Sequence, residues 1–111
     1  MMNRTQYLLI KLAEEAAEVA QIALKSSQFG LTEKNPDMLE TNAERIYAEL
    51  DDLAAIVAML RGENSDFNYV PNAVRQELKR GKVQYYAAYS VRLGMLDAGS
   101  FGSRTKERAE T

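Results

Sequence analysis

The chain has 111 residues, a length that fits a single domain, and it is 46% hydrophobic and 27% charged with a formal net charge of −2. That charge argues against a nucleic-acid polymer as partner, because such partners demand a basic surface. Because the chain lacks cysteine and histidine, disulfides, thiolate chemistry, Ser-His-Asp triads, His-ligated zinc and Glu-x-x-His di-iron sites are excluded. Catalysis, if present, must therefore use carboxylates, Lys, Arg, Tyr or Ser/Thr.

The first predicted element is a helix from residue 5 to about residue 25, rich in Ala, Leu, Glu and Gln. Residues 26–40 then break the helical pattern, with Gly30 and Pro36 as turn signals, and predict a long connection that could be a functional loop. The apolar residues of this helix recur at helical spacing: Leu8, Leu12, Val19, Ile22 and Ala23.

The second predicted helix begins at Thr41, which forms a capping box with Glu44 three residues later, and ends at Gly62. Its apolar stripe comprises Ile46, Leu50, Leu53, Val57 and Leu60. A polar turn then leads to the third helix.

The third helix is expected from Pro71, which suits a first helical position, to Leu93, with Gly81 as an interruption. Its predicted core residues are Val74, Leu78, Tyr85 and Tyr89. Together these patterns predict an all-α fold, with one helical domain over residues 1–96 and a polar, disordered tail over 97–111. The N-terminus has no signal-peptide pattern and no apolar run approaches the ~20 residues of a membrane span, so we expect a cytoplasmic protein without a membrane partner.

Two carboxylates fall inside the apolar stripes. At about 100° per residue, Glu15 lies between Leu8 and Ile22, and Glu18 lies at the edge of that stripe. On the second helix Glu49 falls between Ile56 and Leu60, and Asp52 lies at the margin. The outward-facing acids are Glu14, Glu44 and Asp51.

Each helix thus carries a pair of adjacent acids three residues apart. A buried unpaired carboxylate is costly, and two facing pairs repel, so a divalent cation is the expected partner. Oxygen-only ligands favour Mg²⁺ or Mn²⁺. Two structural alternatives are that the acids form an ordinary solvated face, or that Lys11, Arg45 or Arg61 satisfies them as buried salt bridges.

The residues Glu14-Glu15-x-x-Glu18 and Glu49-x-x-Asp52 resemble the EExxE…ExxD signature of the MazG-like nucleoside triphosphate pyrophosphohydrolases, in particular the short single-domain enzymes of tailed bacteriophages. The resemblance covers roughly residues 5–96. The thirty residues between Glu18 and Glu49 are at the long end for that family, and the extra length lies in residues 26–40.

The resemblance implies cleavage of a (deoxy)nucleoside triphosphate between the α and β phosphates, giving the monophosphate and pyrophosphate. It also implies an all-α antiparallel bundle completed by dimerisation, as a homodimer or dimer of dimers, acting in the host cytoplasm if phage-encoded. Glu15, Glu18, Glu49 and Asp52 would bind Mg²⁺ or Mn²⁺ and form the catalytic set, with Glu15 or Glu18 as the general base. A purine triphosphate such as dGTP is suggested only by analogy with phage enzymes that reshape the host nucleotide pool.

Cations are needed to hold the triphosphate. Lys11 lies near Glu15 and Glu18 on the helical wheel, and the third helix offers a strip of candidate substrate contacts: Lys79, Lys82 and Tyr86. The alternative is that these are ordinary surface residues. For the whole chain, the alternatives are a non-catalytic helical interaction module or a nucleotide or alarmone sensor that binds without turnover.

Overall fold

The computed structural model describes residues 1–99, and these contain three helices and no strand. They are α1 (Arg4–Phe29), α2 (Asn42–Glu63) and α3 (Ala73–Arg92). The all-α class predicted from sequence is therefore confirmed. No helix in this described part carries an apolar stretch of the length that a bilayer would require.

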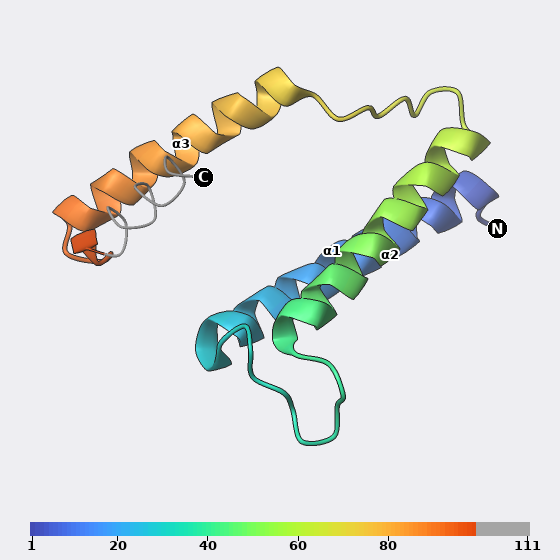
Figure 1. Cartoon of the computed structure of the whole chain (residues 1–111). Helices are drawn as coiled ribbons and strands as arrows, with labels where there is room; N and C mark the ends of the chain where they lie inside the picture. The colour runs from blue at the N-terminus through green and yellow to red at the C-terminus, as the bar shows by residue number, and fades with distance from the viewer. Residues whose placement is uncertain (100–111) are drawn as a thin grey trace. The chain divides into compact units, whose positions relative to one another are not determined.

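The chain divides into two units, Met1–Tyr69 and a second that begins at Val70. The first contains α1 and α2, which lie side by side and antiparallel (Figure 1). The second contains α3. The single helical domain expected over residues 1–96 stays a prediction, and the predicted tail over 97–111 falls almost entirely on residues 100–111, outside the described part.

Helix α1 is longer at its C-terminal end than the sequence pattern predicted. Ser26 is buried in this added turn, and its hydroxyl donates a hydrogen bond to the Ile22 carbonyl at 2.8 Å, which satisfies the polar side chain within the helix. The helix then ends at Gly30, whose φ of 96° suits a residue without a Cβ. The connection to α2 is correspondingly shorter than expected.

The boundaries of the other helices differ from the predictions by one or two residues. Thr41 and Glu44 form the predicted capping box at the start of α2, and this helix runs one residue past Gly62. Helix α3 begins after Asn72, whose side-chain oxygen accepts a hydrogen bond from the Arg75 amide at 2.9 Å. The first helical residue is therefore Ala73 and not the predicted Pro71. Gly81 does not interrupt α3.

The inner face of the hairpin follows the predicted stripes. Leu8, Ile22 and Leu60 are at most 3% exposed and form its buried apolar core. The half-buried residues include Leu12, Val19, Ile46, Leu53 and Val57. Leu50 is 46% exposed and Ala23 is also exposed, so the structure does not bury these two members of the predicted stripes.

The predicted core face of α3 is exposed. The four residues assigned to it, Val74, Leu78, Tyr85 and Tyr89, are between 46% and 73% exposed, and α3 buries no residue. A single helix cannot cover its own apolar stripe, so this face becomes a core only against another element.

The connection between α1 and α2 is fastened by Asn42, a residue that the sequence analysis did not single out. Its side chain is 2% exposed and its Nδ2 donates hydrogen bonds to the Gly30 carbonyl at 2.9 Å and to Glu33 Oε2 at 2.8 Å. Its backbone amide donates to the Glu33 carbonyl at 3.0 Å. These bonds hold the end of α1 against the start of α2.

Loss of the α2 cap should destabilise the hairpin. Thr41→Ala removes the acceptor of the Glu44 amide and should lower the free energy of unfolding by about 1 kcal/mol, measured in urea melts. Hydrogen bonds from the Thr41 amide and hydroxyl lower the pKa of Glu44. The stabilisation that these bonds give to the charged carboxylate is therefore present at neutral pH and is lost as pH falls through the lowered pKa. The difference in unfolding free energy between Thr41→Ala and wild type should therefore be smaller at acidic pH.

The matched control is Thr32→Ala, which truncates an exposed threonine in the same connection. It should change stability by less than about 0.5 kcal/mol. Equal losses from both variants would contradict the role of the cap.

Candidate metal centre

Three of the four predicted metal ligands meet between α1 and α2. Glu15 and Glu18 lie one turn apart on α1, and Glu49 faces them from α2. One carboxylate oxygen from each of the three lies within 4.8 Å of the others. The helical-wheel argument thus identified side chains from two helices that the fold brings together.

Two of these carboxylates have an oxygen that is shielded from solvent and has no partner. Glu15 Oε2 and Glu49 Oε2 are both buried and have no hydrogen-bond partner within the described part of the chain, although each residue as a whole is half-buried. Glu18 is exposed. A buried carboxylate oxygen without a partner is unfavourable, and either a proton or a cation at this position would relieve that cost.

The pKa values respond to this crowding. Loss of solvent raises the pKa of Glu15, and the carboxylates of Glu18, Asp52 and Glu14 add to the effect. The nearby Glu18 carboxyl, which can share a proton with Glu49, raises the pKa of Glu49, and loss of solvent and the charges of Asp52 and Glu15 raise it further. Mutual repulsion therefore disfavours the fully charged cluster when no cation is present.

The alternative that basic side chains neutralise these acids is not seen. Among the ion pairs of residues 1–99, none involves any of the four predicted ligands. Lys11, predicted near Glu15 and Glu18, instead places its Nζ 3.0 Å from Glu14 Oε2 and lies over the Tyr7 ring. Glu14, the outward-facing acid, is thus the one that is paired.

Asp52 lies at the margin of the cluster. It is exposed and does not belong to the compact group of three, but its charge contributes to the raised pKa values of Glu15 and Glu49. The donor set is carboxylate oxygen only, which fits Mg²⁺ or Mn²⁺ and does not fit metals that favour nitrogen or sulfur. The residues present therefore suit the divalent ion that the sequence predicted.

A polar pocket of about 210 Å³ adjoins two of these acids. Its lining comprises Glu18, Gln21, Ile22, Lys25, Arg45 and Glu49. The sequence analysis considered Arg45 only as a salt-bridge partner and missed Gln21 and Lys25 as site residues. Sequence spacing could have identified these residues. Gln21 and Lys25 lie three and seven residues after Glu18, and Arg45 lies four residues before Glu49. Residues at these spacings share one face of a helix.

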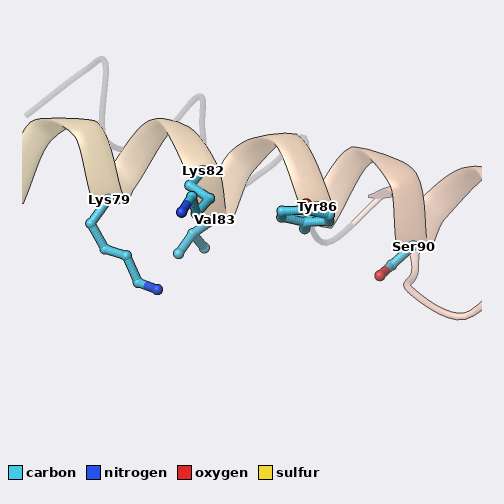
Figure 2. A pocket seen from close by; sticks show the side chains of 6 residues that line it. Lys79, Lys82, Val83, Tyr86 and Ser90 are labelled. Carbon is cyan, nitrogen blue, oxygen red and sulfur yellow. The ribbon is translucent and has the colours of Figure 1, made fainter.

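The remaining predicted substrate residues lie together on α3. Lys79, Lys82 and Tyr86 line an open hollow of about 520 Å³ with Val83, Ala87 and Ser90. Figure 2 shows the labelled side chains of this set along one side of the helix. They belong to the second unit, so their contact with the substrate stays a prediction.

Comparison with known proteins gave no relative. No family model, no curated protein and no solved structure matches the chain. The description of the site therefore depends on its own residues.

Glu49→Gln should stabilise the metal-free protein at neutral pH. The change keeps the shape of the side chain and removes one charge from the crowded cluster, so the melting temperature in chelator should rise above that of wild type. Because the pKa of Glu49 is raised in the folded state, its charge does not destabilise the fold below the ordinary pKa of about 4.5. The destabilisation grows as pH rises through the raised pKa, and the gain in melting temperature of Glu49→Gln should grow with it. Mn²⁺ should shift the melting temperature of the variant less than that of wild type.

Asp51→Asn, which removes an exposed charge from the same helix, is the control and should change the metal-free melting temperature little. If Glu49→Gln melted below wild type in chelator, and Mn²⁺ shifted neither protein, a basic partner for Glu49 would be the better interpretation.

Proposed function

We propose that the protein is a metal-dependent nucleoside triphosphate pyrophosphohydrolase. The observation that carries the proposal is the meeting of three carboxylates from two helices within 4.8 Å, two of them with a buried oxygen that has no partner. The resemblance of the same residues to the EExxE…ExxD signature supports it independently of the geometry. The products would be a nucleoside monophosphate and pyrophosphate.

Glu15, Glu18 and Glu49 would hold the divalent ion, with Asp52 as a further ligand from the margin. When bound, Mg²⁺ or Mn²⁺ would offset the negative charge of the phosphates and make the attacking water more acidic. The protein itself fixes the positions of the carboxylates, because they project from two packed helices and not from a loop.

The reaction adds water across the α–β bridge. The water oxygen forms a bond to one of the two phosphorus atoms beside the bridging oxygen, and the bond from that phosphorus to the bridging oxygen breaks. The bridging oxygen leaves with the electron pair, and the water proton is accepted by Glu15 or Glu18, whichever of the two does not bind the metal tightly. Lys11, Lys79, Lys82 and Tyr86 are proposed as substrate contacts.

We also propose that the active form is a homodimer or dimer of dimers that completes the helical bundle. The hairpin buries only three apolar side chains, which is a small core for a chain of 111 residues. Large apolar side chains remain exposed on every helix; examples are Ile10 and Leu24 on α1, Tyr47 on α2 and Leu78 on α3. Association of identical chains is the usual way to cover such surfaces.

Light scattering at micromolar concentration should therefore give two or four times the mass of one chain. A monomeric protein with full activity would contradict this part of the proposal.

Activity should be measured as pyrophosphate release from a panel of nucleoside and deoxynucleoside triphosphates, including dGTP, with Mg²⁺ or Mn²⁺. Glu15→Gln and Glu49→Gln should each reduce the rate at least ~100-fold, the scale of losing one positioned catalytic group. Glu14→Gln and Asp51→Asn are the matched controls, since each alters an exposed acid close to the cluster in sequence, and they should cost far less.

Equal losses at all four positions would reject the assignment of the inner face. Metal-dependent nucleotide binding without pyrophosphate release would indicate a sensor, and the absence of any metal or nucleotide effect would indicate an interaction module.

A further inference from the structure

We infer that the pocket between Glu18 and Glu49 is the subsite for the terminal phosphates of the substrate, with Lys25 and Arg45 as its cationic contacts and Gln21 as a polar contact. The inference rests on the proposed function and deepens it. It assigns the direction of the bound polyphosphate: from the acid cluster toward the C-terminal end of α1 and the N-terminal end of α2.

The two cations reach the pocket from different helices. Lys25 lies two turns after Glu18 on α1, and Arg45 lies one turn before Glu49 on α2. Gln21 lies between Glu18 and Lys25 on the same face. A pocket of about 210 Å³ that carries two cations and an amide beside carboxylates has the polar character expected for phosphate groups and their metal ion.

Neither cation is engaged elsewhere. Within the described residues, no ion pair and no side-chain hydrogen bond uses Lys25 or Arg45. Both line the pocket that Glu18 and Glu49 also line, yet among residues 1–99 no basic nitrogen lies within ion-pair distance of either acid. The pocket therefore holds opposite charges that are separate and not neutralised by each other.

This separation specifies the ligand. A free polyphosphate would be repelled by Glu18 and Glu49, whereas a metal ion alone can bind the acids but leaves Lys25 and Arg45 without an anionic partner. A divalent cation bound to a di- or triphosphate satisfies both sets, because the metal faces the carboxylates and the phosphate oxygens face Lys25 and Arg45.

Backbone amides do not compete with the side chains for this role. The first amides of α2 are already donors within the fold: Asn42 to the Glu33 carbonyl, Ala43 to the Leu31 carbonyl and Glu44 to Thr41 Oγ1. These three amides at the N-terminus of α2 are therefore not available to bind an anion. Phosphate recognition at this end has to come from the side chains of Lys25, Arg45 and Gln21.

The test uses inorganic pyrophosphate with Mn²⁺ as the probe and the full chain, measured by isothermal titration calorimetry. Wild type should bind the complex, and Lys25→Gln and Arg45→Gln should each weaken its affinity at least about tenfold, the scale of one lost charge-assisted hydrogen bond. Affinity for Mn²⁺ alone should not fall, because both changes remove a positive charge beside the metal.

The control for Arg45 is Arg61→Gln, an exposed arginine about 24 Å further along α2. The control for Lys25 is Lys34→Gln in the α1–α2 connection. Both controls should bind manganese pyrophosphate as wild type does. Lys25→Arg keeps the charge and should retain most of the affinity, which separates loss of charge from loss of fold.

Unchanged pyrophosphate affinity in Lys25→Gln and Arg45→Gln, or no binding by wild type, would overturn the inference. The proposed function fails separately: if pyrophosphate binding depends on Lys25 and Arg45 but no triphosphate is hydrolysed, the subsite stands and the enzyme proposal does not. If triphosphates are hydrolysed and the variants match wild type in KM and in pyrophosphate affinity, the enzyme proposal stands and the subsite does not.

Discussion

The placement of glutamates inside the apolar contact between α1 and α2 is the constraint on which the rest of the structure depends. Glu15 and Glu49 occupy positions where the hairpin would otherwise bury aliphatic side chains, and each has one oxygen cut off from solvent without a partner. In the absence of a cation this arrangement opposes folding, because carboxylates repel one another and lose solvation.

The two ends of the hairpin differ in how they are held. At the end where α1 starts and α2 finishes, Arg4 Nε lies 2.7 Å from Glu63 Oε1 in an exposed ion pair, which contributes little to stability. At the opposite end, the buried Asn42 ties the connection to the start of α2. Lys25 and Arg45 lie toward the end of the hairpin that Asn42 ties together.

The separation of charges within the first unit gives a physical reason for a polyphosphate as ligand. Lys11 is engaged by Glu14 and lies over Tyr7, so it is less available to a substrate than Lys25 and Arg45. A metal complex of a di- or triphosphate has the mixed charge that an isolated cation or anion lacks.

The sequence by itself determined the helical class, the capping box at Thr41 and the inner-facing carboxylates. Each of these follows from residues within one helix: the faces from its periodicity and the cap from a motif at its start. The wheel placed Glu15 and Glu49 within apolar stripes and Glu14 and Asp51 outside them, and their burial agrees. The predicted helix boundaries were wrong where a side chain makes a hydrogen bond to the backbone of its own helix. Ser26 lies within α1 and donates a hydrogen bond to it, and Asn72 caps α3, whose first residue is Ala73 and not Pro71.

Only the tertiary structure decided which faces meet. The distance between Glu18 and Glu49 depends on the register of two helices, and spacing along either one cannot give it. For the same reason the shared pocket of Lys25 and Arg45 became visible only once α1 and α2 were packed, although each cation stood at a helical step from an acid. The exposed apolar stripe of α3 shows the converse: periodicity identifies a face that needs covering, but the surface that covers it lies on another element, and the sequence of one helix does not specify that element.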